Sequence, residues 1–180
     1  MTREISDPAT PAVQAERIAL FTAVRNVPYG TDGAHTADDL FRTNRGDCLA
    51  KADALARGFT RLGYQVRRVR WPYLLPPQPP EVALLPSRRD VHTATEVLLH
   101  GSWALVDATH DPALSALGLT VSEWDGQGST APAYPPTGPT WRAGSDSEKP
   151  MVDALPSPEA RLRYRTAFNR WLATAQAAPA

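Results

Sequence analysis

The sequence predicts an α+β fold, in which a block of helices is followed by antiparallel strands and a last helix. Two observations support this class. Apolar residues recur at helical spacing in segments 11–27 and 48–62. Two later runs, 91–99 and 102–109, alternate like strands and are joined by His100-Gly101, a dipeptide suited to a tight turn.

The first two helices carry recognisable boundary signals. The helix predicted over 11–27 ends at the Pro-Tyr-Gly triplet 28–30. A short helix is predicted over 36–43, with Thr36 as its N-cap and Asp39 completing a weak capping box.

The third helix begins at Cys48 and runs to about Leu62, and Gly63 is suited to end it. A strand is predicted over 64–71. The proline-rich segment 72–86 is too stiff for the interior of a strand or helix, so it predicts a surface loop or flap.

The rest of the chain is less regular. A further strand is predicted over 119–124, which ends a core of about 11–124. Segment 125–156 is rich in Pro, Gly, Ser and Thr, and predicts a long excursion with little regular structure. Ser157-Pro158-Glu159 then starts a helix over 157–175.

Length and composition limit the classes of function. A chain of 180 residues suits one domain, spanning 1–180. Its zero net charge argues against a nucleic-acid or membrane-surface partner. The single cysteine cannot form an internal disulfide, no apolar run approaches the ~20 residues of a membrane span, and the N-terminus lacks the apolar core of a signal peptide. We therefore expect a cytoplasmic protein.

Cys48 is the most informative residue in the chain. It stands at the start of a predicted helix, where unpaired backbone N–H groups and the helix dipole favour a thiolate. His92 and Asp107 follow it in the sequence. The order Cys, His, Asp suggests a nucleophile, a base and an orienting acid.

The predicted hairpin tests this grouping by counting. If His100 and Gly101 are the two turn residues, His92 lies opposite Thr109 and Asp107 lies opposite Ala94. His92 and Asp107 are then diagonal neighbours on one face, with Cα atoms ~7–8 Å apart. A slip of one residue would put them on opposite faces.

The proposed chemistry is acyl transfer or hydrolysis at an amide. His92 takes the proton of Cys48, the thiolate attacks the carbonyl carbon, and Asp107 holds the ring and stabilises its charge. The backbone N–H of Cys48 is one candidate oxyanion donor, and a second is not identified. Loops 72–86 and 125–156 are the candidates for walls or lids. The expected partner is a peptide or protein substrate, or a small amide.

The chain resembles the transglutaminase-like superfamily, the bacterial proteins related to transglutaminases and papain-like cysteine proteases. The resemblance runs from about residue 15 to 112, through segments 24–29, 36–40, 45–48, 61–64, 66–69, 92–97 and 101–107. It implies a Cys-bearing helix packed on an antiparallel sheet that carries His and Asp, with Cys48 as nucleophile, His92 as base and Asp107 as third member. Many members have Trp where this chain has Ala94, whose small side chain would open room beside the triad or expose it to water.

Each candidate also has a plainer interpretation. Cys48 could be a small buried apolar residue, His92 a strand histidine bonded to backbone, and Asp107 the start of a turn. Asp111 is a rival orienting acid, and Glu96 on the His92 face is more simply a rim charge or hydrogen-bond anchor.

No cofactor or metal is expected. The remaining histidines, His35, His100 and His110, lack metal-ligand spacing. The basic cluster is most simply a solvated face, and it consists of Arg67, Arg68, Arg70, Arg88 and Arg89. Two other functions stay open at this point: a non-catalytic binding module that keeps the fold, and an acyltransferase that uses a thioester donor.

Overall fold

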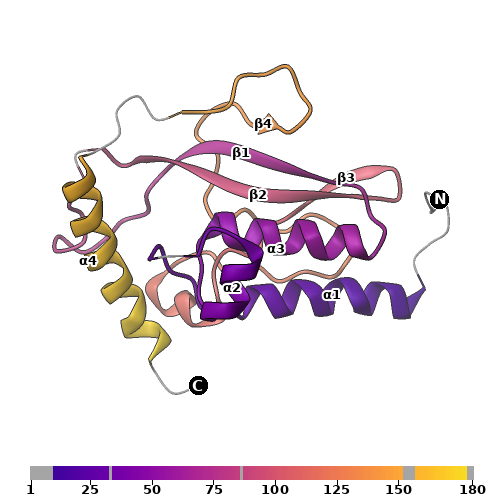
Figure 1. The fold of residues 1–180 in the computed structure, drawn as a ribbon, viewed down its shortest axis with the longest axis horizontal. Helices are drawn as coiled ribbons and strands as arrows, with labels where there is room; N and C mark the ends of the chain where they lie inside the picture. Colours follow the sequence, from indigo (N-terminus) through magenta and orange to yellow (C-terminus); the bar gives the residue numbers. More distant parts are fainter. Residues whose placement is uncertain (1–9, 33, 86, 152–156, 178–180) are drawn as a thin grey trace.

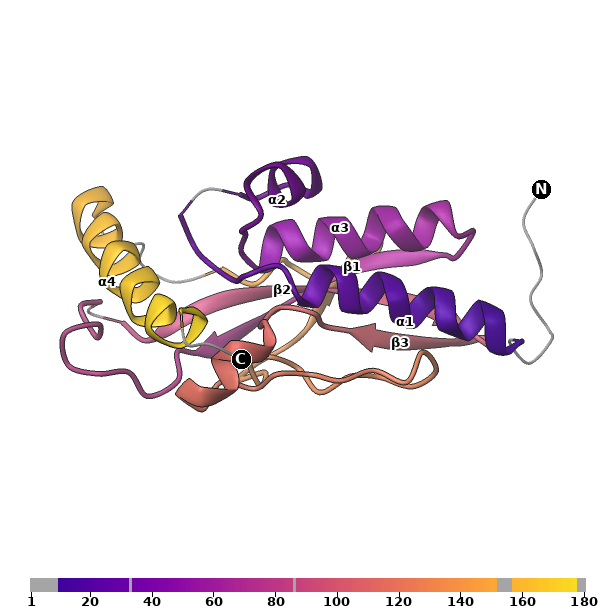
Figure 2. The ribbon, with the colours of Figure 1, turned by 90° about the horizontal axis from the view of Figure 1, so that it is seen from below.

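Helix α3 (Cys48–Arg61) lies along a four-stranded sheet, and helices α1 (Pro11–Arg25) and α2 (Ala37–Thr43) pack against α3 (Figure 1). The computed structural model describes residues 10–32, 34–85, 87–151 and 157–177. Figure 2 shows α1 and α3 running side by side, and α3 is the helix that packs directly on the sheet.

The strands are β1 (Val66–Leu74), β2 (Arg89–Leu99), β3 (Ser102–Val106) and β4 (Trp141–Arg142), in the order β3-β2-β1-β4 and antiparallel throughout. A 3-10 helix, η1 (Pro112–Leu117), follows β3, and α4 (Pro158–Gln176) stands at one end of the sheet (Figure 1). A mixture of helices and an antiparallel sheet confirms the predicted α+β class.

Side-chain caps explain where the helices begin. The hydroxyl of Thr36 accepts the N–H of Asp39 at 3.2 Å and donates to the Asp39 carboxylate at 2.9 Å, so both the predicted start of α2 and its local capping pair are found. Ser157 caps α4 through the N–H of Ala160. Helix α3 ends at Arg61, and Gly63 follows with a φ of 87°, the left-handed conformation that glycine adopts most easily.

The β2–β3 hairpin has the predicted register. His100 and Gly101 have φ angles of 49° and 78°, and Leu99 pairs with Ser102. Two positive φ angles in a two-residue loop match the right-handed twist of the flanking strands. The ladder continues to the pair Thr95 and Val106, so β3 ends three residues before the predicted limit.

Two strand predictions were wrong, one in where the strand ends and one in its existence. Strand β1 runs through Pro72 to Leu74, although the sequence assigned Pro72 to a loop. The carbonyl of Pro72 accepts the N–H of Thr137, on the edge away from β2, so the missing proline N–H faces that edge and interrupts no β1–β2 hydrogen bond. The strand predicted over 119–124 is absent, because groups such as the Ser122 carbonyl bond to side chains instead of a ladder.

The excursion predicted over 125–156 follows both edges of the sheet. Thr130 donates its N–H to the Leu105 carbonyl beside β3, and Ala143 donates to the Arg68 carbonyl beside β1. Its only described strand is the two-residue β4, within the described residues 125–151, and 152–156 lie outside the described residues. The excursion is irregular in form, but its backbone extends the sheet.

Alternating strand positions supply two apolar clusters. Val97, Leu99, Ala104 and Val106 pack with α1 and α3. The other parity, which includes Val69, Trp71, Tyr73 and Ala94, packs with residues of η1, α4 and the excursion. No helix among the described residues is both long enough and apolar enough to cross a membrane.

Candidate active site

Asp47 and Gly46 fix the start of the helix that carries Cys48. The Asp47 carboxylate accepts the N–H groups of Leu49 and Ala50, each at 3.0 Å. A Cβ on Gly46 would lie 2.6 Å from a methyl carbon of Leu40, so only glycine fits there unless that side chain moves. Cys48 as a residue is half-buried, and it is a free cysteine.

The backbone N–H of Cys48 is left without a hydrogen bond. The Asp47 carboxylate accepts the N–H groups of Leu49 and Ala50, and the Asp47 carbonyl accepts the N–H of Lys51 at 3.1 Å. No hydrogen bond from Cys48 N is formed within the described part of the chain. An unpaired N–H at the residue that bears the thiol can donate to an oxyanion formed on an attacked carbonyl.

His92 and Asp107 lie together because of the hairpin register. His92 Nε2 is 2.9 Å from Asp107 Oδ2, and both side chains are fully buried. The carboxylate is an acceptor, so Nε2 carries the hydrogen. The counting argument for the pair is therefore met in the structure: Thr95 pairs with Val106, and Asp107 follows at the next position.

The excursion holds the Asp107 carboxylate. Ala133 donates its N–H to Oδ2 at 2.8 Å, and Thr109 donates to Oδ1 at 3.2 Å. The N–H of Asp107 in turn donates to the Thr130 hydroxyl at 3.0 Å. A buried carboxylate with this many donors keeps one orientation and stays ionised.

Opposing effects set the charges of the pair. Burial alone lowers the pKa of His92, but the charge and hydrogen bond of Asp107, with smaller contributions from Cys48, raise the pKa to about 10. Burial raises the pKa of Asp107, but His92, Thr109 and Ala133 lower it to about 2. The imidazolium and the carboxylate therefore stabilise each other across the neutral range.

The second ring nitrogen of His92 has no partner. Nδ1 is buried and makes no hydrogen bond to any described residue, while Nε2 is taken by Asp107. The Cys48 thiol is close enough to raise the pKa of His92, so Nδ1 is the nitrogen available to it, without a well-aligned hydrogen bond in this state. Such loose pairs are common in sites without substrate.

Three aromatic rings surround the His92 imidazole. The ring centroid of Trp71 lies at 4.9 Å, that of Tyr134 at 5.2 Å and that of Tyr73 at 6.1 Å, all edge-on. His92 is 0% exposed and Asp107 is 2% exposed, so the small side chain of Ala94 does not open these two residues to water. The rings lock the imidazole in place and keep it dry.

Helix α3 packs on the sheet face opposite in parity to His92. The hydroxyl of Thr95 donates to the Ala52 carbonyl of α3 at 2.8 Å, whereas His92 shares its face with Trp71 and Ala94. The sequence did not identify which face α3 covers. Cys48, the first residue of α3, is nonetheless close enough to His92 to raise its pKa.

The other charged candidates have structural partners. Asp111 accepts the N–H of Tyr29 and the amide of Gln176, both at 2.8 Å, so it does not orient His92. Glu96 pairs with Arg67 at 2.5 Å and with Arg142 at 3.3 Å, which matches the hydrogen-bond anchor that we favoured. Of the basic cluster, Arg67 and Arg68 are in ion pairs rather than free in solvent.

His35 and His110 have different surroundings. Half-exposed His35 lies 2.5 Å from the cap residue Asp47, which places it beside the start of α3. His110 is buried between the Thr120 carbonyl and the Tyr134 hydroxyl, and burial lowers its pKa to about 4. No group of three or more His, Cys, Asp or Glu in the described ranges is arranged to hold a metal ion.

Sequence reasoning missed Lys51, Tyr134 and Ala133. Lys51 is only 1% exposed, and Tyr134 is 3% exposed. The position of Lys51, one turn after Cys48, was a signal that could have been read. For Tyr134 and Ala133 the sequence carries no signal, because they come from an irregular segment and meet the site only through tertiary contacts.

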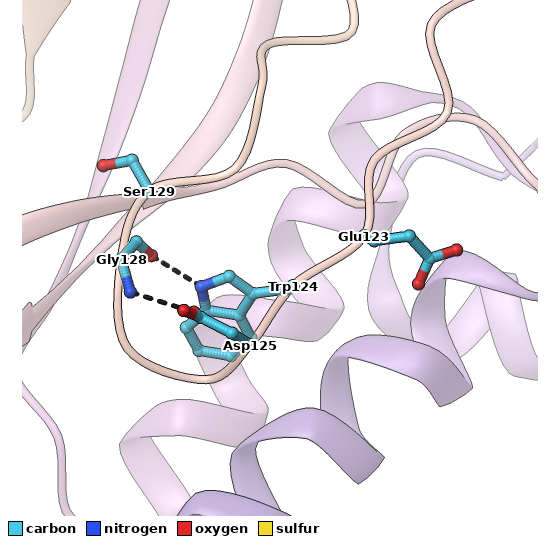
Figure 3. Close-up of a pocket in the computed structure, with 5 residues that line it drawn as sticks. All are labelled: Glu123, Trp124, Asp125, Gly128 and Ser129. Atoms are coloured by element: carbon cyan, nitrogen blue, oxygen red, sulfur yellow. Dashed lines mark hydrogen bonds between the residues drawn. The ribbon is translucent and has the colours of Figure 1, made fainter.

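A surface hollow of about 470 Å³ lies away from this site. It is lined by Glu123, Trp124, Asp125, Gly128 and Ser129 (Figure 3). The indole N–H of Trp124 donates to the Gly128 carbonyl inside a turn, and its ring packs on Phe59 near the other end of α3 from Cys48. The Ser129 hydroxyl in its lining accepts the N–H of Leu105 at 3.0 Å, which fixes the turn beside β3.

Comparison with known proteins adds little to this geometry. No protein-family model matches the chain, and no curated protein matches it. Among solved structures, the chain is similar to a protein from Cytophaga hutchinsonii described as a "putative cysteine protease", with 19% identity and a TM-score of 0.37. The match covers 76% of this chain and 48% of that one, so the chain spans about half the length of that protein.

Proposed function

We propose that this protein is a thiol enzyme that cleaves or transfers acyl groups at amide bonds through a thioester on Cys48. His92 is the base. Asp107 orients the His92 ring and stabilises its positive charge, and the substrate is a peptide, an isopeptide or a small amide. The fold that fits this proposal is the papain and transglutaminase-like arrangement.

One observation carries the proposal: the buried Nδ1 of His92 has no partner and the Cys48 thiol is the titratable neighbour that acts on it. An unpaired buried nitrogen costs free energy, on the order of 1–3 kcal/mol. Its retention beside a thiol is expected where that nitrogen must take and return a proton. The unpaired Cys48 N–H supports the same assignment.

The reaction needs only groups already described. The Cys48 sulfur attacks the carbonyl carbon, and the new oxyanion accepts the Cys48 N–H. His92 passes its Nδ1 proton to the leaving amine as the C–N bond breaks. Water, or a second amine, then attacks the thioester, gives a proton to His92 and releases the acyl group. Asp107 keeps the ring oriented throughout.

A small activated ester tests the thioester directly. We expect p-nitrophenyl acetate to acetylate Cys48, detected by intact mass and by peptide mapping. Cys48→Ser should abolish the adduct, and His92→Ala should slow its formation by roughly 10²–10⁴-fold. An acetylation rate that His92→Ala leaves unchanged would contradict the assignment of the base and favour a non-catalytic module.

A peptide-amide library then separates hydrolysis from transfer. Turnover without added amine supports a hydrolase, and a product that appears only with an amine acceptor supports transfer. If neither peptide nor isopeptide substrates turn over while Cys48 still acetylates in a His92-dependent manner, the amide substrate is wrong and the thiol mechanism stands.

A further inference from the structure

Lys51 is a buried cation one turn after the proposed nucleophile. It is one of two lysines in the chain and is only 1% exposed. Its Nζ donates to the carbonyl of Arg25, the last residue of α1, at 3.0 Å. No ion pair within 4.0 Å joins it to a described carboxylate. A helix residue three positions after Cys48 faces a similar direction, toward the interior beside the site.

The groups that face Lys51 come from two neighbouring segments. The guanidinium of Arg25 approaches from α1, and Asp107, His110 and Asp111 approach from the segment that joins β3 to η1. Burial, aided by Arg25, lowers the pKa of Lys51 to about 7, against the opposing attraction of Asp111 and Asp107. Asp107, one of these two acids, is also the carboxylate that accepts the hydrogen bond of His92.

Packing alone does not account for this lysine. A methionine would fill a similar volume without an ammonium to desolvate, and apolar replacements of buried charges are often neutral or stabilising. The single hydrogen bond to the α1 carbonyl gives limited compensation. A buried charge retained beside a proposed catalytic carboxylate points to an electrostatic role.

We propose that Lys51 is a positioning residue that acts through Asp107 and His92, its ammonium balancing the buried carboxylates so that the thiolate–imidazolium pair forms at lower pH. This inference rests on the proposed roles of Cys48 and His92. The sign follows from charge: a nearby positive charge makes it easier for Cys48 to lose a proton, and its removal makes this harder.

Alkylation of Cys48 by iodoacetamide reports this directly and needs no substrate. We expect Lys51→Met to move the pH of half-maximal alkylation rate upward by several tenths of a pH unit or more. The matched control is Lys149→Met, which removes the other lysine, whose ammonium lies over the Trp141 ring, and should leave the midpoint unchanged. A folded Lys51→Met protein with the wild-type midpoint would overturn the proposal.

A second measurement uses the intact lysine and avoids any loss of folding. With ¹³Cε-labelled lysine, Lys51 and Lys149 give two side-chain resonances. Coupling is reciprocal, so Cys48→Ser should move the Lys51 titration midpoint to lower pH by about as much as Lys51→Met moves the alkylation midpoint upward. A Lys51 midpoint that ignores Cys48→Ser would contradict the inference.

The two proposals fail in different ways. If His92→Ala leaves the alkylation profile unchanged, the proposed base is wrong. If His92→Ala changes the profile while Lys51→Met does not, the catalytic assignment stands and the role of Lys51 is lost.

Discussion

The Asp107 carboxylate sets the charge and orientation of the His92 ring. Its Nε2–H donates to a carboxylate that is itself held by two backbone N–H groups, and its Nδ1 is left free. Because Asp107 cannot rotate away, the imidazole keeps one tautomer when neutral and one orientation when charged. At neutral pH the ring therefore carries a proton on each nitrogen, and the Nδ1 proton is bonded to no acceptor among the described residues.

Replacing Asp107 with asparagine tests this at the residue scale. Asp107→Asn keeps a side-chain acceptor but removes the charge that raises the pKa of His92. We expect the His92 titration midpoint, followed by NMR of the ring protons, to fall from about 10 toward or below the ordinary 6.5. Acylation of Cys48 should slow by roughly 10³–10⁴-fold. An unchanged His92 titration would show that Asp107 does not set its charge.

Tyr134 gives a second residue-scale prediction. The pKa of His110 is lowered to about 4 by burial, so the ring is neutral; its Nδ1–H donates to the Thr120 carbonyl, and Nε2 accepts from the Tyr134 hydroxyl at 2.9 Å. Tyr134→Phe leaves that acceptor buried without a donor. We expect the free energy of unfolding to fall by about 1–3 kcal/mol in urea denaturation. Thr137→Val, which removes an exposed hydroxyl bound to the Pro72 carbonyl, is the control and should lower the free energy of unfolding by less.

At the scale of elements, the start of α3 is held by a single side chain. Asp47 caps two N–H groups and also contacts His35. Asp47→Ala should lower the free energy of unfolding by about 1 kcal/mol. Asp47→Asn should lower it much less, because an amide oxygen can still accept the capping hydrogen bonds. Chemical denaturation of both variants checks the order. Equal losses would mean that the charge contact with His35, not the cap, stabilises the helix start.

The elements that sequence predicted well carry local signals. Helices α2, α3 and α4 begin at the caps Thr36, Asp47 and Ser157, and the hairpin turns at His100-Gly101. Caps and two-residue turns are decided by neighbouring residues, which is why these boundaries could be predicted. Pro72 misled because its place in β1 depends on which edge its nitrogen faces, a tertiary property. The same limit explains the absent strand over 119–124.

In the candidate site, too, the residues placed by local structure could be predicted, and those placed by tertiary contacts could not. The contact between His92 and Asp107 follows from register alone, so counting along a hairpin was enough to place it. Ala133 and Tyr134 could not be found this way, since they approach from an irregular segment about 26 residues after Asp107. The place of Lys51 one turn after Cys48 was visible in the sequence, but the groups around it come from α1 and from residues 107–111, which only the structure brings together.

At the scale of the whole molecule, two layers meet around a set of buried charges. The helix layer contributes Lys51, and the sheet with its edge segment contributes His92, Asp107 and Asp111. Two cations and two carboxylates share one interior, so the protonation of one affects the stability that the others contribute. The fold therefore couples its stability to the chemistry of the site.

The pH dependence of stability provides the last prediction. The folded-state pKa of His92 is raised from 6.5 to about 10, so its stabilisation is complete below pH 6.5 and is lost as pH rises toward 10. The pKa of Lys51 is lowered from 10.5 to about 7, so its burial costs most below pH 7 and the cost fades as pH rises toward 10.5. Between pH 7 and 10 the two effects oppose each other.

Wild-type stability should therefore change little over this range. Lys51→Met removes one of the two effects, and its free energy of unfolding should fall with pH by up to ~1.4 kcal/mol per pH unit, the limit for one proton. Urea denaturation at several pH values between 7 and 10 measures both slopes. If the slope of Lys51→Met equals that of wild type, the ammonium of Lys51 does not lose its proton on folding, and the opposing contributions assigned to the two layers are wrong.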